Sequence, residues 1–446
     1  MNRQKLFENS CIEKHIGYRP HLVWFCWRTI PTGGRDPMQL NTITELLDIP
    51  NYKVTHVIQN DGNSLHFIVD QIKPLPPVCS GCGRVHAGGI HSVWVNMVED
   101  LPISGKRVFL HISRRKVCCT EDGTIRVEEI AWIRKRFSLR FAEQVYRLTA
   151  ITTNQEAGWY LGLDDETVYR IDKCMLEKLA KETIDSPVAP TMMSVDEVSW
   201  QKRHKYVTNV IDIQKRKVIW NHNGRGKYVL DKFYRKLGPE GCENIQAVAS
   251  DGARGFLSST KAFAKNALIV LDHFHVKKSL NDALDTVRKE ELRRAQKENN
   301  DELSQILHCN QRFILMQSKK SKRKTDVLNK LAVLNERIYQ AMLLKEQFLA
   351  VYKTKDLKTA RTNLKEWIVA AMKSKISVFV ELGNKFFRKR HFILNYFLCN
   401  ITTAISEGIN NKIKRLSRMA YGFKDVYYFL LKIHQHCGML NPRVST

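Results

Sequence analysis

The spacing of the apolar residues changes at about residue 191, and this change limits the fold more than any other feature of the chain. After Pro187 and Pro190, strand-like spacing appears in three successive runs, at 193–198, 206–213 and 217–220. A helical run at 227–237, a strand-like run at 245–249, another short helix and a strand-like run at 267–271 then alternate, and a long helix begins at about 274. Three strands in hairpin order followed by alternating helices and strands predict a mixed α/β layer. From 280 to about 390 the spacing is helical only, so the expected fold class is α/β plus α.

The segment in front of this layer predicts a small β-rich region followed by helices. Alternating residues predict a hairpin between 53 and 72 and a second strand pair at 92–98 and 107–117. Residues 138–182 have helical spacing, with a turn after Gly162 and with Asp164 suited to cap the next helix. This is the order of a helix-turn-helix, in which three side chains would face a DNA groove: Tyr169, Arg170 and Lys173. An ordinary helical hairpin is the alternative.

The charge of the chain points to an anionic partner. The 446 residues include 72 Lys and Arg against 45 Asp and Glu, a formal charge of +27. Nucleic acid is the first candidate, because neutralising phosphates releases counterions. A membrane surface is weaker, since no apolar run approaches a spanning length. The 11 cysteines are scattered and no secretion signal is evident, so we expect reduced cytosolic thiols.

Three acids are candidates for metal-dependent chemistry on DNA. Asp196 lies within the first strand of the layer and Asp251 ends the fourth, so the two side chains meet if these strands are neighbours. On a later helix, Glu407 shares one face with Asn411, Lys414 and Arg418, opposite a stripe of Ile405, Ile409, Ile413 and Leu416. Two-metal phosphodiester chemistry needs converging carboxylates, and cations suit DNA phosphates. Turn-capping aspartates and a solvated helix face are the alternatives.

The cysteines form one pattern with metal-ligand spacing. Cys79 and Cys82 are separated by two residues, as in zinc sites, whereas the next pair, Cys118 and Cys119, is adjacent. Adjacent thiolates rarely both bind one tetrahedral ion, so we expect Zn²⁺ on Cys79, Cys82 and one of this pair, with His86 or His91 as a fourth ligand. A region that folds without metal is the alternative.

The order of these motifs resembles the bacterial DDE transposases of the ISL-three family, from about Met38 to the C-terminus. The resemblance rests on short pieces in the family's order: 79–83, Asp100-Leu101-Pro102, Arg114-Arg115, 194–197, 205–208, Ser250-Asp251, 272–278, 407–414 and 421–423. It implies an RNase H-like mixed-sheet core interrupted by an all-helical insertion. It also implies a triad of Asp196, Asp251 and Glu407 with two Mg²⁺ or Mn²⁺ ions, and a supporting role for His275. A further implication is a cytoplasmic protein associated with the bacterial nucleoid. Thr402-Thr403 departs from the Ser-Asn that usually precedes the Glu helix.

These expectations divide the chain into six parts. Residues 1–37 are either an upstream extension or a disordered arm, and 38–130 form a β-rich zinc-finger-like domain. The helix-turn-helix region covers 131–190, the core 191–285 and 391–446, and the helical insertion 286–390. The expected function is DNA transposition: binding of terminal inverted repeats, then cleavage and strand transfer by an assembly that is at least a dimer. A DNA-binding regulator or inactive domesticated transposase is one alternative, and a structure-specific nuclease is another.

Overall fold

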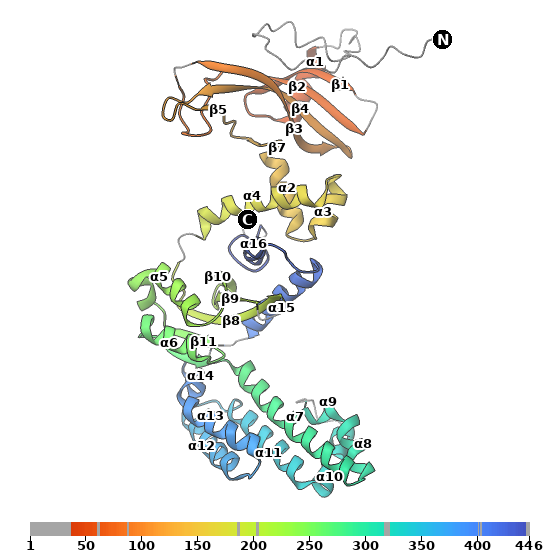
Figure 1. Ribbon diagram of the computed structural model, residues 1–446, viewed down its shortest axis with the longest axis vertical. Helices are drawn as coiled ribbons and strands as arrows, with labels where there is room; N and C mark the ends of the chain where they lie inside the picture. Colours follow the sequence, from red (N-terminus) through yellow and green to blue (C-terminus); the bar gives the residue numbers. More distant parts are fainter. Residues whose placement is uncertain are drawn as a thin grey trace, which may run out of the picture. The chain divides into compact units, whose positions relative to one another are not determined.

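The computed structural model describes residues 37–59, 63–86, 89–184, 188–201, 205–315, 322–399, 401 and 404–442 (Figure 1). The chain divides into two compact units, one of residues 1–151 and 157–175 and the other of residues 152–156 and 176–446. The expectations for residues 1–36 and for Thr402-Thr403 lie outside the described residues. No helix of the described part is both long and apolar enough to cross a membrane.

The first unit is built on a seven-stranded sheet. After helix α1 (Pro37–Leu47), its strands are β1 (Tyr52–Gln59), β2 (Ser64–Gln71), β3 (Ile90–Ile103), β4 (Lys106–Cys118), β5 (Ile125–Val127), β6 (Ile133–Arg134) and β7 (Phe137–Ser138). They lie in the order β1-β2-β4-β3-β7-β6, with β5 beside β4. The hairpin β1–β2 and the antiparallel pair β3–β4 are the two strand pairs that the alternation predicted. Buried aliphatic side chains such as Val98, Leu110 and Ile112 form the core of the sheet.

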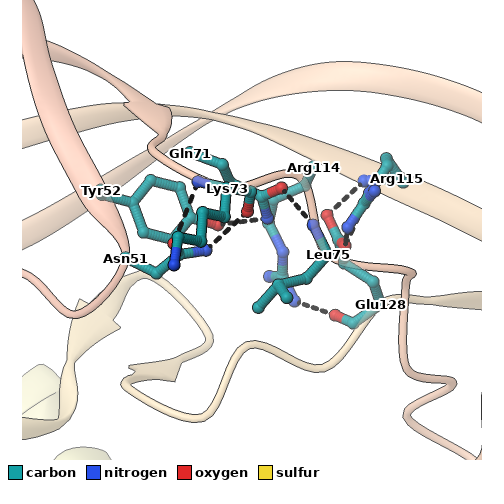
Figure 2. A network of polar contacts seen from close by, with 8 residues as sticks. All are labelled: Asn51, Tyr52, Gln71, Lys73, Leu75, Arg114, Arg115 and Glu128. Carbon is teal, nitrogen blue, oxygen red and sulfur yellow. Dashed lines mark hydrogen bonds and ion pairs between the residues drawn. The ribbon is translucent and has the colours of Figure 1, made fainter.

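Polar contacts fasten the segment after β5 to the middle of this sheet (Figure 2). The Arg115 guanidinium donates to the Glu128 carboxylate at 2.7–2.8 Å, and the Arg115 backbone N–H donates to the same carboxylate at 2.8 Å. Arg114 donates to the carbonyl oxygen of Glu128. Because the Glu128 side chain is only 2% exposed, it depends on these donors for its hydrogen bonds. The contacts therefore hold the chain close to β4 just after the turn that carries Cys119.

Three helices follow the sheet: α2 (Leu139–Thr149), α3 (Asn154–Leu161) and α4 (Asp165–Thr183). Only three residues separate α3 from α4, and Asp164 caps α4 by accepting from the Thr167 backbone N–H at 2.8 Å, as the sequence predicts. The chain passes close to α3 in this turn, where a Cβ on Gly158 would lie 2.6 Å from the Leu163 carbonyl oxygen. In the buried interior, the Thr149 hydroxyl of α2 donates to Asp172 of α4 at 2.7 Å.

The second unit contains the predicted mixed α/β layer. Its five strands are β8 (Met192–Gln201), β9 (Lys205–Asp212), β10 (Lys217–Asn223), β11 (Ala247–Ser250) and β12 (Leu268–Leu271), in the order β10-β9-β8-β11-β12. The pairs β10–β9 and β9–β8 are antiparallel, whereas β11 runs parallel to both β8 and β12. The first and fourth strands are thus neighbours, which is the arrangement that would let Asp196 and Asp251 meet.

The two faces of this sheet have different helices on them. Val195 packs with α5 (Lys227–Glu243) and α6 (Arg254–Phe263), whereas Val198 packs with α15 (Ala404–Met419) and α16 (Val426–Cys437). Since successive strand residues point to opposite faces, Asp196 is directed to the face that α15 covers.

Between β12 and α15 the described chain is entirely helical. The helices are α7 (His273–Lys297), α8 (Asp301–Cys309), α9 (Gln311–Leu315), α10 (Lys322–Leu334), α11 (Glu336–Val351), α12 (Leu357–Lys373), α13 (Ser377–Leu394) and α14 (Tyr396–Cys399). They share a core of their own, which includes Trp367, Phe386 and also Leu271 of β12. Through Leu271 this helical region is packed onto the sheet.

Candidate active site and zinc site

The parallel pairing of β8 and β11 brings the first two acids to one edge of the sheet. Ala249 pairs with Ser194, so the positions two residues further along each strand, Asp251 and Asp196, continue the same register. Asp251 follows β11 directly and is exposed, with one oxygen accepting from the Ala253 backbone N–H at 2.8 Å. This turn needs glycine at 252, since its φ is +75° and a Cβ would lie 2.5 Å from Leu271.

The Asp196 carboxylate is partly buried and held by two donors. Its Oδ1 accepts from the Glu197 backbone N–H at 2.8 Å, and its Oδ2 accepts from the side-chain amide of Asn410 on α15. Burial raises the pKa of Asp196, and the neighbouring carboxylates Asp272 and Asp251 raise it further. A concentrated negative charge of this kind favours a cation among the acids.

Asp272 is a fourth acid at this edge. The sequence motif 272–278 includes it, but sequence reasoning gave it no role as an acid of the site. Leu271 pairs with Ser250, so Asp272 follows β12 as Asp251 follows β11. Its Oδ1 accepts from the Phe274 backbone N–H at 2.8 Å and caps α7, while its Oδ2 contacts His275 Nδ1 at 2.9 Å. The sequence signal that indicates such a role is its position directly after a buried apolar strand, which Asp251 shares.

His275 lies among these aspartates. The hydrogen bond to Asp272 raises the pKa of His275, and the charges of Asp196 and Asp251 act in the same direction. The imidazole is therefore favoured in its protonated form, which offsets part of the negative charge of the acids.

Glu407 lies in the first turn of α15 and lines the same pocket as Asp196. The pocket has a volume of about 230 Å³, and it is also lined by His275, Lys278, Asn410, Asn411 and Lys414. Asp251 lines a second pocket of about 230 Å³, which shares His275 and Lys278 with the first. The three predicted acids are thus distributed over two pockets that share the first two turns of α7.

The stripes predicted for α15 are present. Ile409, Ile413 and Leu416 are buried, whereas Glu407, Asn411, Lys414 and Arg418 are exposed. Arg418 is not among the residues that line either pocket. The helix also buries Asn410, which belongs to neither predicted stripe and contacts Asp196.

A second cluster, in the first unit, consists of Cys79, Cys82, His86 and Cys119, whose ligand atoms all lie within 4.8 Å of one another. Two similar turns supply it. The Gly83 N–H donates to the Cys79 carbonyl and the Gly123 N–H to the Cys119 carbonyl, both at 2.9 Å, and both glycines have positive φ. His86 provides the fourth ligand atom, at 3.0 Å from the Cys82 sulfur.

Cys118 is not a member of this cluster, nor is His91. Cys118 ends β4, where it pairs with Ile125, while Cys119 opens the turn that faces Cys79. Of the adjacent pair, the structure therefore brings only Cys119 to the other ligands.

The electrostatics of this cluster fit a bound cation. The backbone N–H of Cys82 is the main cause that lowers the pKa of Cys79 to about 6, which favours the thiolate. Burial raises the pKa of Cys119, and the neighbouring thiols Cys82 and Cys79 add to the effect. Several thiolates can be held this close only if a positive ion balances them.

The candidate DNA-contacting residues on α4 have local partners. Arg170 forms an exposed ion pair with Glu166 at 3.0 Å, and Lys173 contacts the Tyr169 hydroxyl at 3.2 Å. An exposed ion pair of this kind on a helix surface is weak, so Arg170 can exchange Glu166 for another anion.

Comparison with known proteins decides the class to which these sites belong. The model of a family of DDE transposases of the ISL3 type, described as "Transposase", matches residues 193–433, more than half of the chain. The chain belongs to this DDE transposase family. A second model, described as the zinc-finger of transposase IS204/IS1001/IS1096/IS1165, matches residues 75–122 of this DDE transposase.

Curated relatives extend the similarity over most of this DDE transposase. The transposase for insertion sequence element IS1001 of Bordetella parapertussis is 29% identical over 369 residues, which cover 81% of this chain and 89% of the relative. The transposase for insertion sequence element IS1557 of Mycobacterium tuberculosis (strain H37Rv) is 24% identical over 406 residues, 82% of this chain and 87% of the relative. The prediction of the family from sequence motifs is confirmed.

Membership in a DDE transposase family implies the use of a divalent metal ion, and the acids of this chain fit one. The available donors around Asp196 are carboxylate oxygens, which hard cations such as Mg²⁺ prefer. Burial is the main cause that raises the pKa of Asp196, and the charges of Asp272 and Asp251 act in the same direction, so a cation would stabilise its carboxylate. The zinc-finger match and the Cys79–Cys82–His86–Cys119 cluster in turn suit a softer ion such as Zn²⁺.

Proposed function

We propose that this DDE transposase binds the terminal inverted repeats of an insertion sequence and catalyses metal-dependent DNA cleavage and strand transfer with Asp196, Asp251 and Glu407. The parallel register of β8 and β11 carries this proposal, because it sets the two aspartates at one edge of the sheet. Glu407 comes from α15, which covers the face to which Asp196 points, and it lines the same pocket.

The proposed core is RNase H-like. Its support is a sheet of three antiparallel strands extended by two parallel ones, with helices on both faces. On this view, residues 191–285 and 391–446 form the core, and residues 286–390 are an all-helical insertion between its two parts. Residues 38–130 and 131–190 are the proposed zinc-finger-like and helix-turn-helix regions.

Asp196, Asp251 and Glu407 would hold two Mg²⁺ or Mn²⁺ ions. Asp272 lies close enough to add its negative charge to the site. Bound there, such ions would activate a nucleophilic oxygen and stabilise the leaving oxygen of an in-line displacement. Asn410 fixes the orientation of the Asp196 carboxylate, and Lys278 and Lys414 are placed to hold backbone phosphates beside the acids.

The reaction would proceed in two displacements at phosphorus. Water attacks the phosphodiester at the end of the element, the P–O bond to the 3′ oxygen breaks, and a 3′-hydroxyl is released. That hydroxyl then attacks a phosphodiester of target DNA, forms a new P–O bond and displaces the target's 3′ oxygen. No covalent intermediate with the protein is needed.

Recognition of the ends would fall to the first unit and to α15. Tyr169, Arg170 and Lys173 would contact a DNA groove from α4, and Asn411, Lys414 and Arg418 would contact DNA from α15. The Zn²⁺ site would stabilise the fold of residues 75–122. Two ends must be joined, so the active assembly would be at least a dimer, working on double-stranded DNA in the bacterial cytoplasm.

An end-containing duplex incubated with Mg²⁺ and the full-length protein tests the proposal. A transposase cleaves at the end and joins the product to a target plasmid, a regulator only shifts the mobility of the duplex, and a structure-specific nuclease cleaves without joining. Glu407→Gln should abolish cleavage while end binding stays within about twofold, because only the metal-binding charge is lost. The exposed Glu366→Gln on α12 is the matched control. Cleavage by Glu407→Gln at the wild-type rate would remove Glu407 from the site.

A further inference from the structure

The pocket on the Asp251 side of the active site is partly built by the helical region. Besides Asp251 and residues of α7, it is lined by Lys385 and Phe386 of α13. Helix α13 lies more than 100 residues after Asp251 in the chain, near the end of the region whose structure is helical only. The helical region therefore contributes side chains to the surroundings of a candidate metal-binding acid.

Four contacts fix the position of α13 against the acid-bearing edge. Phe386 is only 1% exposed and belongs to the same core as Leu271 of β12. The Asn395 amide donates to the Ile269 carbonyl at 2.8 Å, and the Lys389 ammonium donates to the Gly252 carbonyl at 2.6 Å. Lys385, one helical turn before Lys389, approaches the Ser279 hydroxyl of α7 at 3.4 Å. Lys385 is thus carried on a rigid support, although its own side chain is exposed.

The two lysines of this pocket form no ion pair with any described residue, although the acids Asp251 and Asp282 also line the pocket. These lysines are Lys278 and Lys385, whereas the chain contains many ion pairs elsewhere on its helices. Lys278 borders both pockets, so it lies between Lys385 on one side and Lys414 on the other. Three lysines from α7, α13 and α15 consequently flank the row of acids. Lysine is a point charge that binds phosphate well and is costly to order without an anion.

We propose that Lys385, with Lys278, binds one backbone phosphate of the DNA on the Asp251 side of the active site. The helical region is then a part of the active site, and its role is to fix the DNA strand beside the acids. This inference rests on the proposed function for the reaction that it assists, but the phosphate contact itself can be measured without any reaction.

Binding in EDTA tests the contact directly. The probes are duplexes that span the junction between flanking DNA and the terminal inverted repeat next to this coding sequence, each with one neutral methylphosphonate at a successive backbone position. If Lys385 holds one phosphate, a single position should weaken wild-type binding about 3- to 10-fold and weaken the binding of Lys385→Ala clearly less, because only Lys278 remains there. Lys365→Ala, an exposed lysine on α12, should behave as the wild type at every position. The proposal is overturned if no position distinguishes Lys385→Ala from Lys365→Ala.

Single-turnover cleavage at saturating protein tests the consequence. Lys385→Ala should cleave about 10- to 100-fold more slowly than the wild type, and Lys385→Arg should recover most of the rate because it retains the charge. Equal rates for Lys385→Ala and Lys365→Ala would contradict the proposal. If the wild type and Asp251→Asn cleave alike, the proposed catalytic site fails instead, and the methylphosphonate result still decides whether Lys385 holds a phosphate.

Discussion

The side-chain amide of Asn410 donates a hydrogen bond to the carboxylate of Asp196, across 214 residues of sequence. The other oxygen of the same carboxylate accepts from the Glu197 backbone N–H, so both oxygens have a fixed direction. Asn410 is buried, with 7% of its surface exposed, and it is therefore a positioning residue for Asp196. It also connects α15, which carries Glu407, to the strand that carries the first acid.

Removing this amide should impair cleavage more than DNA binding. We expect Asn410→Ala to slow single-turnover cleavage about tenfold and to raise the Mg²⁺ concentration that gives half the maximal rate, because Asp196 becomes free to rotate. Asn410→Asp should be slower still, since a second carboxylate would face Asp196. Asn363→Ala on α12 is the control. An unchanged Mg²⁺ requirement in Asn410→Ala, with a reduced melting temperature, would indicate a purely structural role.

The two adjacent cysteines should differ in their effect on bound zinc. Only Cys119 lies with Cys79, Cys82 and His86, so Cys119→Ser should lower the zinc content of the purified protein well below one ion per chain. Cys118→Ser should retain the ion. Atomic absorption after extensive dialysis measures both variants under the same conditions. The reverse result, with zinc lost only from Cys118→Ser, would show that the assignment of Cys119 as the ligand is wrong.

Arg170 and Arg147 form a matched pair for testing the role of α4 in DNA binding. Each is an exposed arginine paired with a glutamate four residues earlier, with 70% and 67% of the side chain exposed. If α4 contacts the groove, Arg170→Ala should weaken binding to end-containing DNA by about 1–3 kcal/mol and leave binding to unrelated DNA less affected. Arg147→Ala on α2 should weaken binding to end-containing DNA less than Arg170→Ala does. If each variant loses as much binding to unrelated DNA as to end-containing DNA, neither arginine reads sequence.

The stability of the second unit should fall as the solution becomes acidic, in part because of His434. Burial lowers the pKa of this histidine to about 4, so the folded state keeps it neutral while the unfolded chain takes up a proton below about pH 6.5. The contribution of neutral His434 to the free energy of unfolding is complete above pH 6.5. It is lost as the pH falls toward 4, and the loss is at most about 3 kcal/mol.

Thermal unfolding at a series of pH values checks this. The melting temperature of His434→Leu should depend less on pH between 6.5 and 4 than that of the wild type. The exposed His308→Gln should follow the wild type. Parallel curves for His434→Leu and the wild type would show that the buried ring does not titrate in this range.

Sequence periodicity predicted the strands and helices of the second unit, since β8 to β12 and α5 to α7 follow the spacing of apolar residues. It also placed Asp196 and Asp251 on strands that the structure shows to be neighbours. The choice of Cys119 over Cys118 was not predictable, because it depends on where β4 ends and which way the next turn opens. The role of Asn410 was not predicted, for a related reason. A helical wheel separates polar from apolar stripes, but it does not show that a polar residue at the border is buried against a carboxylate on another element.

The contact between α15 and β8 can form only late in the synthesis of the chain. Asp196 and Asp251 leave the ribosome long before Glu407 and Asn410, and the helices between them form from local contacts while the last segment is still missing. The residues of the first unit come earlier still. A nascent or prematurely terminated chain can thus fold its zinc-finger and α4 regions without possessing the third acid. On the proposed function, such a product would bind DNA ends without cutting them and would compete with complete copies of the same protein.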